Sequence, residues 1–175
     1  KHSLVDSEYN ERRSRCEEAA KFFAKNLHHP VKALRDVSWT EWQRYASQMH
    51  PMAAKRAAHV IGENARVLKA RELLGEGKLK EFGQLMFESH DSSREHFENS
   101  CPELDTLVAA ARQTKAVLGA RLSGGGFGGS AVVLTRPNDA ESVTHALTLA
   151  YQKKYGHPCD VQVIRPAAGA RVVTG

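Results

Sequence analysis

The 175-residue chain is predicted to fold as an α+β domain, with a small, mainly antiparallel sheet packed against several helices. Apolar residues recur at helical spacing over the first two thirds of the sequence, which predicts a run of helices. From Val117 onward the pattern changes to that of short strands around a glycine-rich turn. The length fits one domain with a full hydrophobic core.

Composition and charge narrow the function classes. With 41% hydrophobic and 26% charged residues, the sequence is typical of a globular domain, and no apolar run approaches the ~20 residues that a membrane-spanning helix needs. The net charge is +5, but basic and acidic residues alternate, so no nucleic-acid or membrane partner is expected. The three cysteines are scattered and form no Cys-x-x-Cys pair, which disfavours zinc and disulfides and predicts a cytoplasmic location.

The first helix is expected to begin at a cap on Asp6 or Ser7 and to end near Asn26, before Pro30. A short segment follows, whose apolar side chains Val31, Leu34 and Val37 are expected to tuck against the core.

Two helices come next. Ser38 and Glu41 have the spacing of a capping box, which predicts a short helix through Tyr45. Pro51 suits the first turn of a long helix to about Leu74. Its expected apolar stripe is Ala54, Ala57, Ala58, Ile61, Ala65 and Leu68.

A further helix is expected from about Leu79 to Phe97, and Pro102 begins a shorter one. Residues 117–123 and 130–135 are predicted strands, and residues 137–139 are expected to cap a helix that carries Val143 and Leu147. A final strand is predicted over residues 161–164.

The loop between the first two strands is the most informative segment. It holds five glycines in six positions, which permits left-handed backbone and the close approach of another backbone or a ligand. Two interpretations stay open at this point: a structural hairpin turn, or a backbone nest whose amides contact a phosphate directly. The loop residues are Ser123, Gly124, Gly125, Gly126, Phe127, Gly128 and Gly129.

Residues 119–129 resemble the third signature motif of the GHMP small-molecule kinases, which act on galactose, homoserine, mevalonate and phosphomevalonate. Within that superfamily the chain resembles the galactokinases. Several further segments are similar to that family in order and spacing: residues 2–4, 7–13, 16–17, 34–37, 59–64, 85–90 and 101–105.

The resemblance implies a GHMP-kinase C-terminal domain over residues 1–175. It implies transfer of a phosphoryl group from ATP, with Mg²⁺, to the C1 hydroxyl of α-D-galactose, giving galactose 1-phosphate and ADP. The first two family signatures have no counterpart here, so the N-terminal domain with the catalytic residues and the phosphate loop is expected as the missing partner. No catalytic residue and no metal ligand is therefore expected in this chain, and the chain alone is expected to be inactive.

For Tyr9, the residue type alone favours a half-buried packing tyrosine, whereas the resemblance implies a hydrogen bond to a sugar hydroxyl. For residues 123–129, it implies a loop that packs beside the phosphate loop and lines the cleft. Ser130 stands where galactokinases commonly have cysteine.

Other candidates have simpler expected roles. Arg12, Arg13 and Arg15 are expected to form a solvated helix face with neighbouring glutamates. His59 and Glu63 have the spacing of a metal pair but no third ligand, so His59 is expected at the surface or at a cap. The same role is expected for His90 and His96, and Cys16 is expected in the core.

Three alternatives to galactokinase remain open from the sequence. One is a kinase for another hexose such as N-acetylgalactosamine. Another is a non-catalytic sensor that binds galactose and ATP. The third is an unrelated α+β domain with a glycine-rich hairpin.

Overall fold

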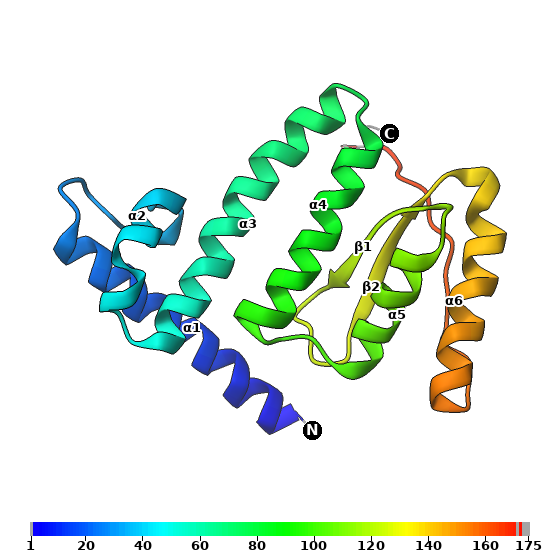
Figure 1. The fold of residues 1–175 in the computed structure, drawn as a ribbon, viewed down its shortest axis with the longest axis horizontal. Coiled ribbons are helices and arrows are strands. Elements are labelled where there is room, and N and C mark those ends of the chain that lie inside the picture. The colour runs from blue at the N-terminus through cyan, green and yellow to red at the C-terminus, as the bar shows by residue number, and fades with distance from the viewer. Residues whose placement is uncertain (1, 171, 173–175) are drawn as a thin grey trace.

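The computed structural model describes residues 2–170 and residue 172, with side chains from residue 8 onward. In this part of the chain, six α-helices and two strands form two groups joined by α4 (Figure 1). The helices are α1 (His2–Asn26), α2 (Trp39–Tyr45), α3 (Pro51–Gly75), α4 (Leu79–Ser92), α5 (Pro102–Gln113) and α6 (Ala140–Tyr155). The strands are β1 (Val117–Ser123) and β2 (Ser130–Thr135). None of the helices described combines the length and apolar character needed to cross a membrane.

The first group of elements packs α1 and α3 around one core. Phe23 of α1 and Ala57 of α3 are completely buried there, and Leu34 of the short 3₁₀ turn η1 (Leu34–Asp36) closes the core. The predicted capping box at the start of α2 is confirmed, because the Ser38 amide donates to Glu41 Oε2 at 2.8 Å and Ser38 Oγ accepts from the Glu41 amide.

The second group packs the β1–β2 hairpin against α4, α5 and α6. The two strands pair antiparallel, with Ala120 opposite Val133 and Leu122 opposite Ala131. Ala120 shares a buried cluster with Phe87 of α4, and the other members of that cluster are Val108, Ala111, Val143 and Leu147. Both strands have the bounds that the sequence predicts.

The backbones of α4 and β1 touch where they cross. A Cβ placed on Gly83 would lie 1.9 Å from the carbonyl oxygen of Leu118, and one on Gly119 would lie 2.4 Å from the carbonyl oxygen of Gly83. No side chain fits between the two elements at this point, so glycine is required in both.

His90 fastens the same crossing and corrects the prediction of a surface or capping histidine. Its side chain is 1% exposed, its Nδ1 accepts a hydrogen bond from the Leu122 amide at 3.2 Å, and its Nε2 lies 3.1 Å from Asp105 Oδ1. Since Nδ1 is the acceptor, Nε2 carries the proton and donates to the carboxylate. His90 thus joins α4 to both β1 and α5.

The helix boundaries differ from the predictions in two places, and in a third the predicted cap lies where expected but lacks a side-chain bond. Helix α1 begins at His2, so the backbone of the expected cap residues Asp6 and Ser7 is already helical, and their side chains lie outside the described part. The helix expected to reach Phe97 changes after Ser92 into a π-helical turn, η3 (Ser93–Phe97). Asp139 occupies the N-cap of α6 without a side-chain capping bond.

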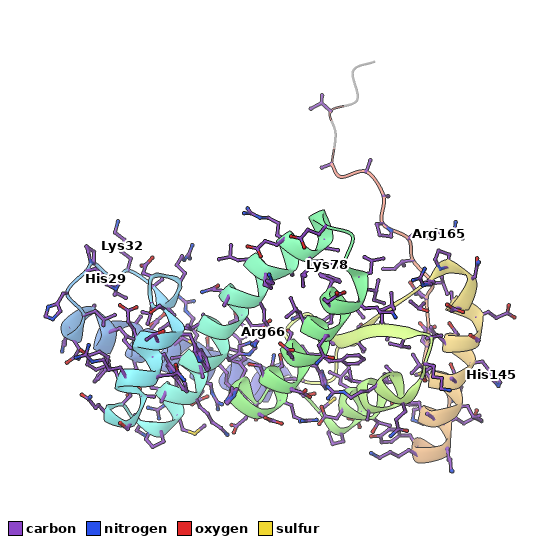
Figure 2. All side chains as sticks on the ribbon, turned by 45° about the horizontal axis from the view of Figure 1, so that its top comes forward. His29, Lys32, Arg66, Lys78, His145 and Arg165 are labelled. Atoms are coloured by element: carbon purple, nitrogen blue, oxygen red, sulfur yellow. The ribbon has the colours of Figure 1, made fainter. Side chains whose placement is uncertain are left out.

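Two apolar patterns do not bury the residues expected. Leu68 is 59% exposed and Ala65 is exposed, because no described element covers this face of the C-terminal half of α3, although Leu73 in the same half is buried. Residues 161–164 form no strand, since they pair with neither edge of the two-stranded sheet, and Ile164 is 77% exposed. Figure 2 shows the segment around Arg165 running away from the body of the molecule.

Candidate functional site

A cleft of about 310 Å³ opens where α1, α3, η3 and the loop between β1 and β2 meet. It brings together Tyr9 and the loop residues Gly124, Gly125 and Phe127, which the sequence analysis singled out. The other predicted loop residues, Ser123, Gly126, Gly128 and Gly129, are not among the residues that line it.

Tyr9 projects from α1 with 57% of its surface exposed. It does not lie in the first turn of the helix, because α1 begins at His2. Tyr9 lines the cleft, and a tyrosine with this exposure contributes little to the core. The packing interpretation of Tyr9 therefore does not describe the structure.

The glycine loop requires left-handed backbone at alternate positions. The φ angles of Gly124, Gly126 and Gly128 are 78°, 83° and 98°, values that side chains with a Cβ rarely adopt. Phe127 also has a positive φ, 54°, although it is not glycine. Such a residue keeps its conformation only where neighbouring contacts hold it.

Those contacts come from Asn99, which follows η3. The Phe127 amide donates to the carbonyl oxygen of Asn99 at 2.8 Å, and Asn99 Nδ2 donates to the Gly125 carbonyl at 3.1 Å. A Cβ on Gly126 would lie 2.0 Å from that same Asn99 carbonyl oxygen. The loop is thus packed closely against the turn at residues 98–99.

The prediction of a solvated side chain is wrong for Arg12. Its side chain is 12% exposed, and its Nε and Nη2 donate to the carbonyl oxygens of Phe97 at 3.1 Å and Glu98 at 2.9 Å. The guanidinium also lies 5.6 Å from the ring centroid of Phe127. The prediction holds for Arg13, which is 71% exposed and pairs with Glu17.

Two basic residues of α3 hold the same turn from the other side. Arg56 is 1% exposed and donates to the His96 carbonyl at 2.7 Å and to Glu98 Oε2 at 2.9 Å, and Lys55 pairs with the second oxygen of Glu98. The hydrogen bond from Lys55, with those from Arg56, lowers the pKa of Glu98. These charges stabilise the left-handed backbone of Glu98, whose φ is 56°.

His59 lines the cleft and is neither a surface residue nor a cap. Its Nδ1 lies 3.0 Å from Ser92 Oγ, and its ring packs against that of Phe97 with 4.6 Å between centroids. Burial lowers the pKa of His59 to about 4, so the imidazole is neutral at physiological pH. The third histidine, His96, is half-buried, and its carbonyl oxygen accepts the bond from Arg56.

Glu63 does not act with His59 as a metal pair. Its carboxylate accepts a hydrogen bond from Ser89 Oγ at 2.7 Å and pairs with Arg66, and Arg121 Nη1 lies 3.7 Å away. Among residues 2–170 and 172, no three histidine, cysteine or acidic side chains are grouped as metal ligands.

The cysteines behave as expected. All three thiols are free, and Cys16 packs at the edge of the first core. Burial raises the pKa of Cys16 to about 11, so its thiol is protonated and unreactive at neutral pH.

The spacing of Tyr9 and Arg12 contains a signal that sequence reasoning missed. Residues three apart share one face of a helix, so an arginine three positions after a cleft tyrosine faces the same region. By contrast, no sequence pattern indicates that Asn99, 25 positions or more from the loop glycines, supports the loop.

Comparison with known proteins defines the class to which this fold and cleft belong. Residues 70–153 match the family model of the GHMP kinases C terminal domain. The chain therefore carries a GHMP-kinase C-terminal domain, as its motifs predict.

The relatives within this class are galactokinases. The chain is 43% identical to galactokinase of Mannheimia succiniciproducens over 98% of its own length, which is 44% of that protein. It superposes on Lactococcus lactis galactokinase complexed with galactose with a TM-score of 0.82 and 33% identity, over 87% of this chain and 39% of the other. The chain is thus similar to galactokinases along nearly all of its own length, and it spans less than half the length of these relatives.

Proposed function

We propose that the protein to which this chain belongs is an ATP-dependent galactokinase. It transfers the γ-phosphoryl group of ATP to the C1 hydroxyl of α-D-galactose and releases galactose 1-phosphate and ADP. The observation that supports this most directly is the cleft, where Tyr9 and the glycine loop meet as the resemblance to galactokinases implies. The similarity to galactokinases along nearly the whole chain supports it as well.

In this proposal the chain is the C-terminal domain and completes the site. The Tyr9 hydroxyl hydrogen-bonds a sugar hydroxyl, and residues 123–129 line the cleft beside the phosphates of ATP. The N-terminal domain supplies the catalytic residues and the phosphate loop. The described residues contain no group of three metal-ligating side chains, and in this proposal the N-terminal domain holds Mg²⁺. A cytoplasmic location, predicted from the cysteines, belongs to the same proposal.

The test is an ATP-coupled assay on the full-length protein with galactose as acceptor. Loss of one hydrogen bond to the sugar in Tyr9→Phe is expected to raise the KM for galactose about tenfold. Tyr151→Phe is the matched control: Tyr151 lies on α6, which contributes nothing to the cleft, and the KM is expected to stay unchanged.

The other outcomes of this assay identify the alternatives. Turnover of N-acetylgalactosamine in place of galactose indicates a kinase for another hexose. Binding of galactose and ATP without turnover indicates a sensor. Residues 1–175 alone are expected to show no kinase activity, and appreciable turnover by them contradicts the division of roles between the two domains.

A further inference from the structure

Arg12 connects the helix that carries Tyr9 with the glycine loop. It is not itself one of the residues predicted to contact the sugar or to line the cleft. We infer that Arg12 is a positioning residue, which fixes the loop of residues 123–129 relative to Tyr9 through the carbonyl groups of Phe97 and Glu98. This inference rests on the proposed function and adds to it a residue whose role is to align the two sides of the cleft.

The first step in the connection is the guanidinium of Arg12. It is nearly buried, and two of its N–H groups donate to adjacent carbonyl oxygens, those of Phe97 and Glu98. Hydrogen bonds from a charged donor are stronger than neutral ones, and a planar fork fixes direction as well as distance. Nη2 also donates to Glu8 and Nη1 donates to Glu11, and these bonds hold the guanidinium in this orientation.

The second step runs from this turn to the loop. Asn99, the next residue, accepts the hydrogen bond of the Phe127 amide and donates to the Gly125 carbonyl. The contact at Gly126 leaves no room between the loop and the Asn99 carbonyl oxygen. Any shift of residues 97–99 is therefore transmitted to the loop, and Arg12 also touches the loop directly over the ring of Phe127.

Arg12 is the contact that relates this turn to Tyr9. Arg56 and Lys55 bind the turn from α3, and toward α1 Arg56 has a looser ion pair with Glu11 Oε2, 3.8 Å from its Nη2. Arg12 adds the restraint from α1, the helix on which Tyr9 stands three positions earlier. Without Arg12, the loop keeps its support from α3 but loses its alignment with the residue proposed to hold the sugar.

Kinetics of the full-length enzyme test the inference. Arg12→Gln is expected to lower kcat about 100-fold, the size of effect that a misplacement of about 1 Å produces, while the KM for galactose stays within about twofold because Tyr9 is retained. Arg13→Gln removes the same charge from the neighbouring exposed position and is expected to leave both constants unchanged. An Arg12→Gln enzyme with kcat near that of the wild type overturns the inference.

A double-mutant cycle separates positioning from a general loss of stability. Gly126→Ala displaces the loop through a change in the loop itself, because the added methyl group meets the Asn99 carbonyl oxygen. If Arg12 acts through the loop, Arg12→Gln lowers kcat much less in the Gly126→Ala background than in the wild type. Fully multiplicative losses overturn the inference, since they indicate independent effects.

Arg12→Lys provides a second variant if Arg12→Gln does not fold. A lysine ammonium keeps the charge but lacks the rigid planar fork that fixes both carbonyl groups, so an intermediate loss of about tenfold in kcat is expected. Full activity of Arg12→Lys contradicts the inference. A wild-type enzyme without kinase activity contradicts the proposed function instead, so the two failures are distinguishable.

Discussion

Two regions of the domain each depend on glycine and histidine. At the crossing of α4 and β1 these residues are enclosed by protein, whereas at the cleft they border an open space. Gly83, Gly119 and His90 make the crossing, where backbones touch and the imidazole bonds both β1 and α5. Gly124 and His59 line the cleft, where the glycine supplies backbone conformation and leaves a free surface.

The difference shows that glycine meets two separate physical demands in this domain. At the crossing the demand is space, because a Cβ would overlap another backbone. At Gly124 the demand is a left-handed φ, because a Cβ there would meet no atom within 4 Å. Substitutions in the two regions should therefore differ in size and in what they affect.

The largest effect is expected from Gly83→Ala. A methyl group 1.9 Å from a backbone oxygen forces α4 and β1 apart, which should cost more than about 4 kcal/mol of the free energy of unfolding. Chemical denaturation measures the loss. A variant that unfolds like the wild type would show that the two backbones are not in contact.

The next largest loss of stability is expected from substitution of His90, the histidine enclosed at the crossing. His90→Leu leaves the buried Leu122 amide without an acceptor and Asp105 without its imidazole partner, so a loss of about 2–3 kcal/mol is expected. His90→Asn, whose side-chain oxygen can replace Nδ1 as acceptor, should recover part of that stability. Equal losses in the two variants would contradict a role for the Leu122 bond.

The protonation of His59, the histidine in the cleft, should make the free energy of unfolding depend on pH. The pKa of His59 is near 4 in the folded protein and about 6.5 when unfolded, so the unfolded state binds more protons between these values. The stabilisation from neutral His59 is complete above pH 6.5 and is lost as the pH falls toward 4, by up to about 1.4 kcal/mol per pH unit.

Denaturation of the wild type and of His59→Gln across this pH range measures the contribution. The difference in unfolding free energy between the two proteins should change with pH, since glutamine does not titrate. A difference that is constant from pH 4 to 6.5 would contradict the buried, neutral imidazole.

The smallest effect is expected at Gly124. Gly124→Ala encounters no atom, so its cost is the left-handed conformation alone, about 1 kcal/mol. Gly125→Ala, where φ is not positive and the space is also open, is the control and should change stability by less than about 0.5 kcal/mol. Equal costs at the two positions would show that φ does not govern this loop.

Local sequence signals predicted most of the elements. The change from helical to alternating spacing, with glycines between, gave the bounds of β1 and β2, and the Ser38–Glu41 box gave the start of α2. These predictions succeeded because each depends on residues close together in the chain.

The failures depend on distant residues. The apolar stripe of α3 predicts one continuous buried face. Leu68 is nevertheless exposed, because burial depends on whether another element packs against that part of the helix. Residues 161–164 have strand-forming side chains but no paired edge. Arg12 and His90 were misplaced because their partners, Glu98 and Leu122, lie far along the sequence.

The bond from Arg12 to Phe97 also bears on the order of folding. It joins residues 85 positions apart, whereas the α3–α4 pair and the β hairpin form between neighbours in sequence. Contacts that close long loops form after local ones, because the entropy of closure must first be overcome. We therefore expect the cleft to assemble late, and its geometry to be lost at denaturant concentrations where helices α3 and α4 are still intact.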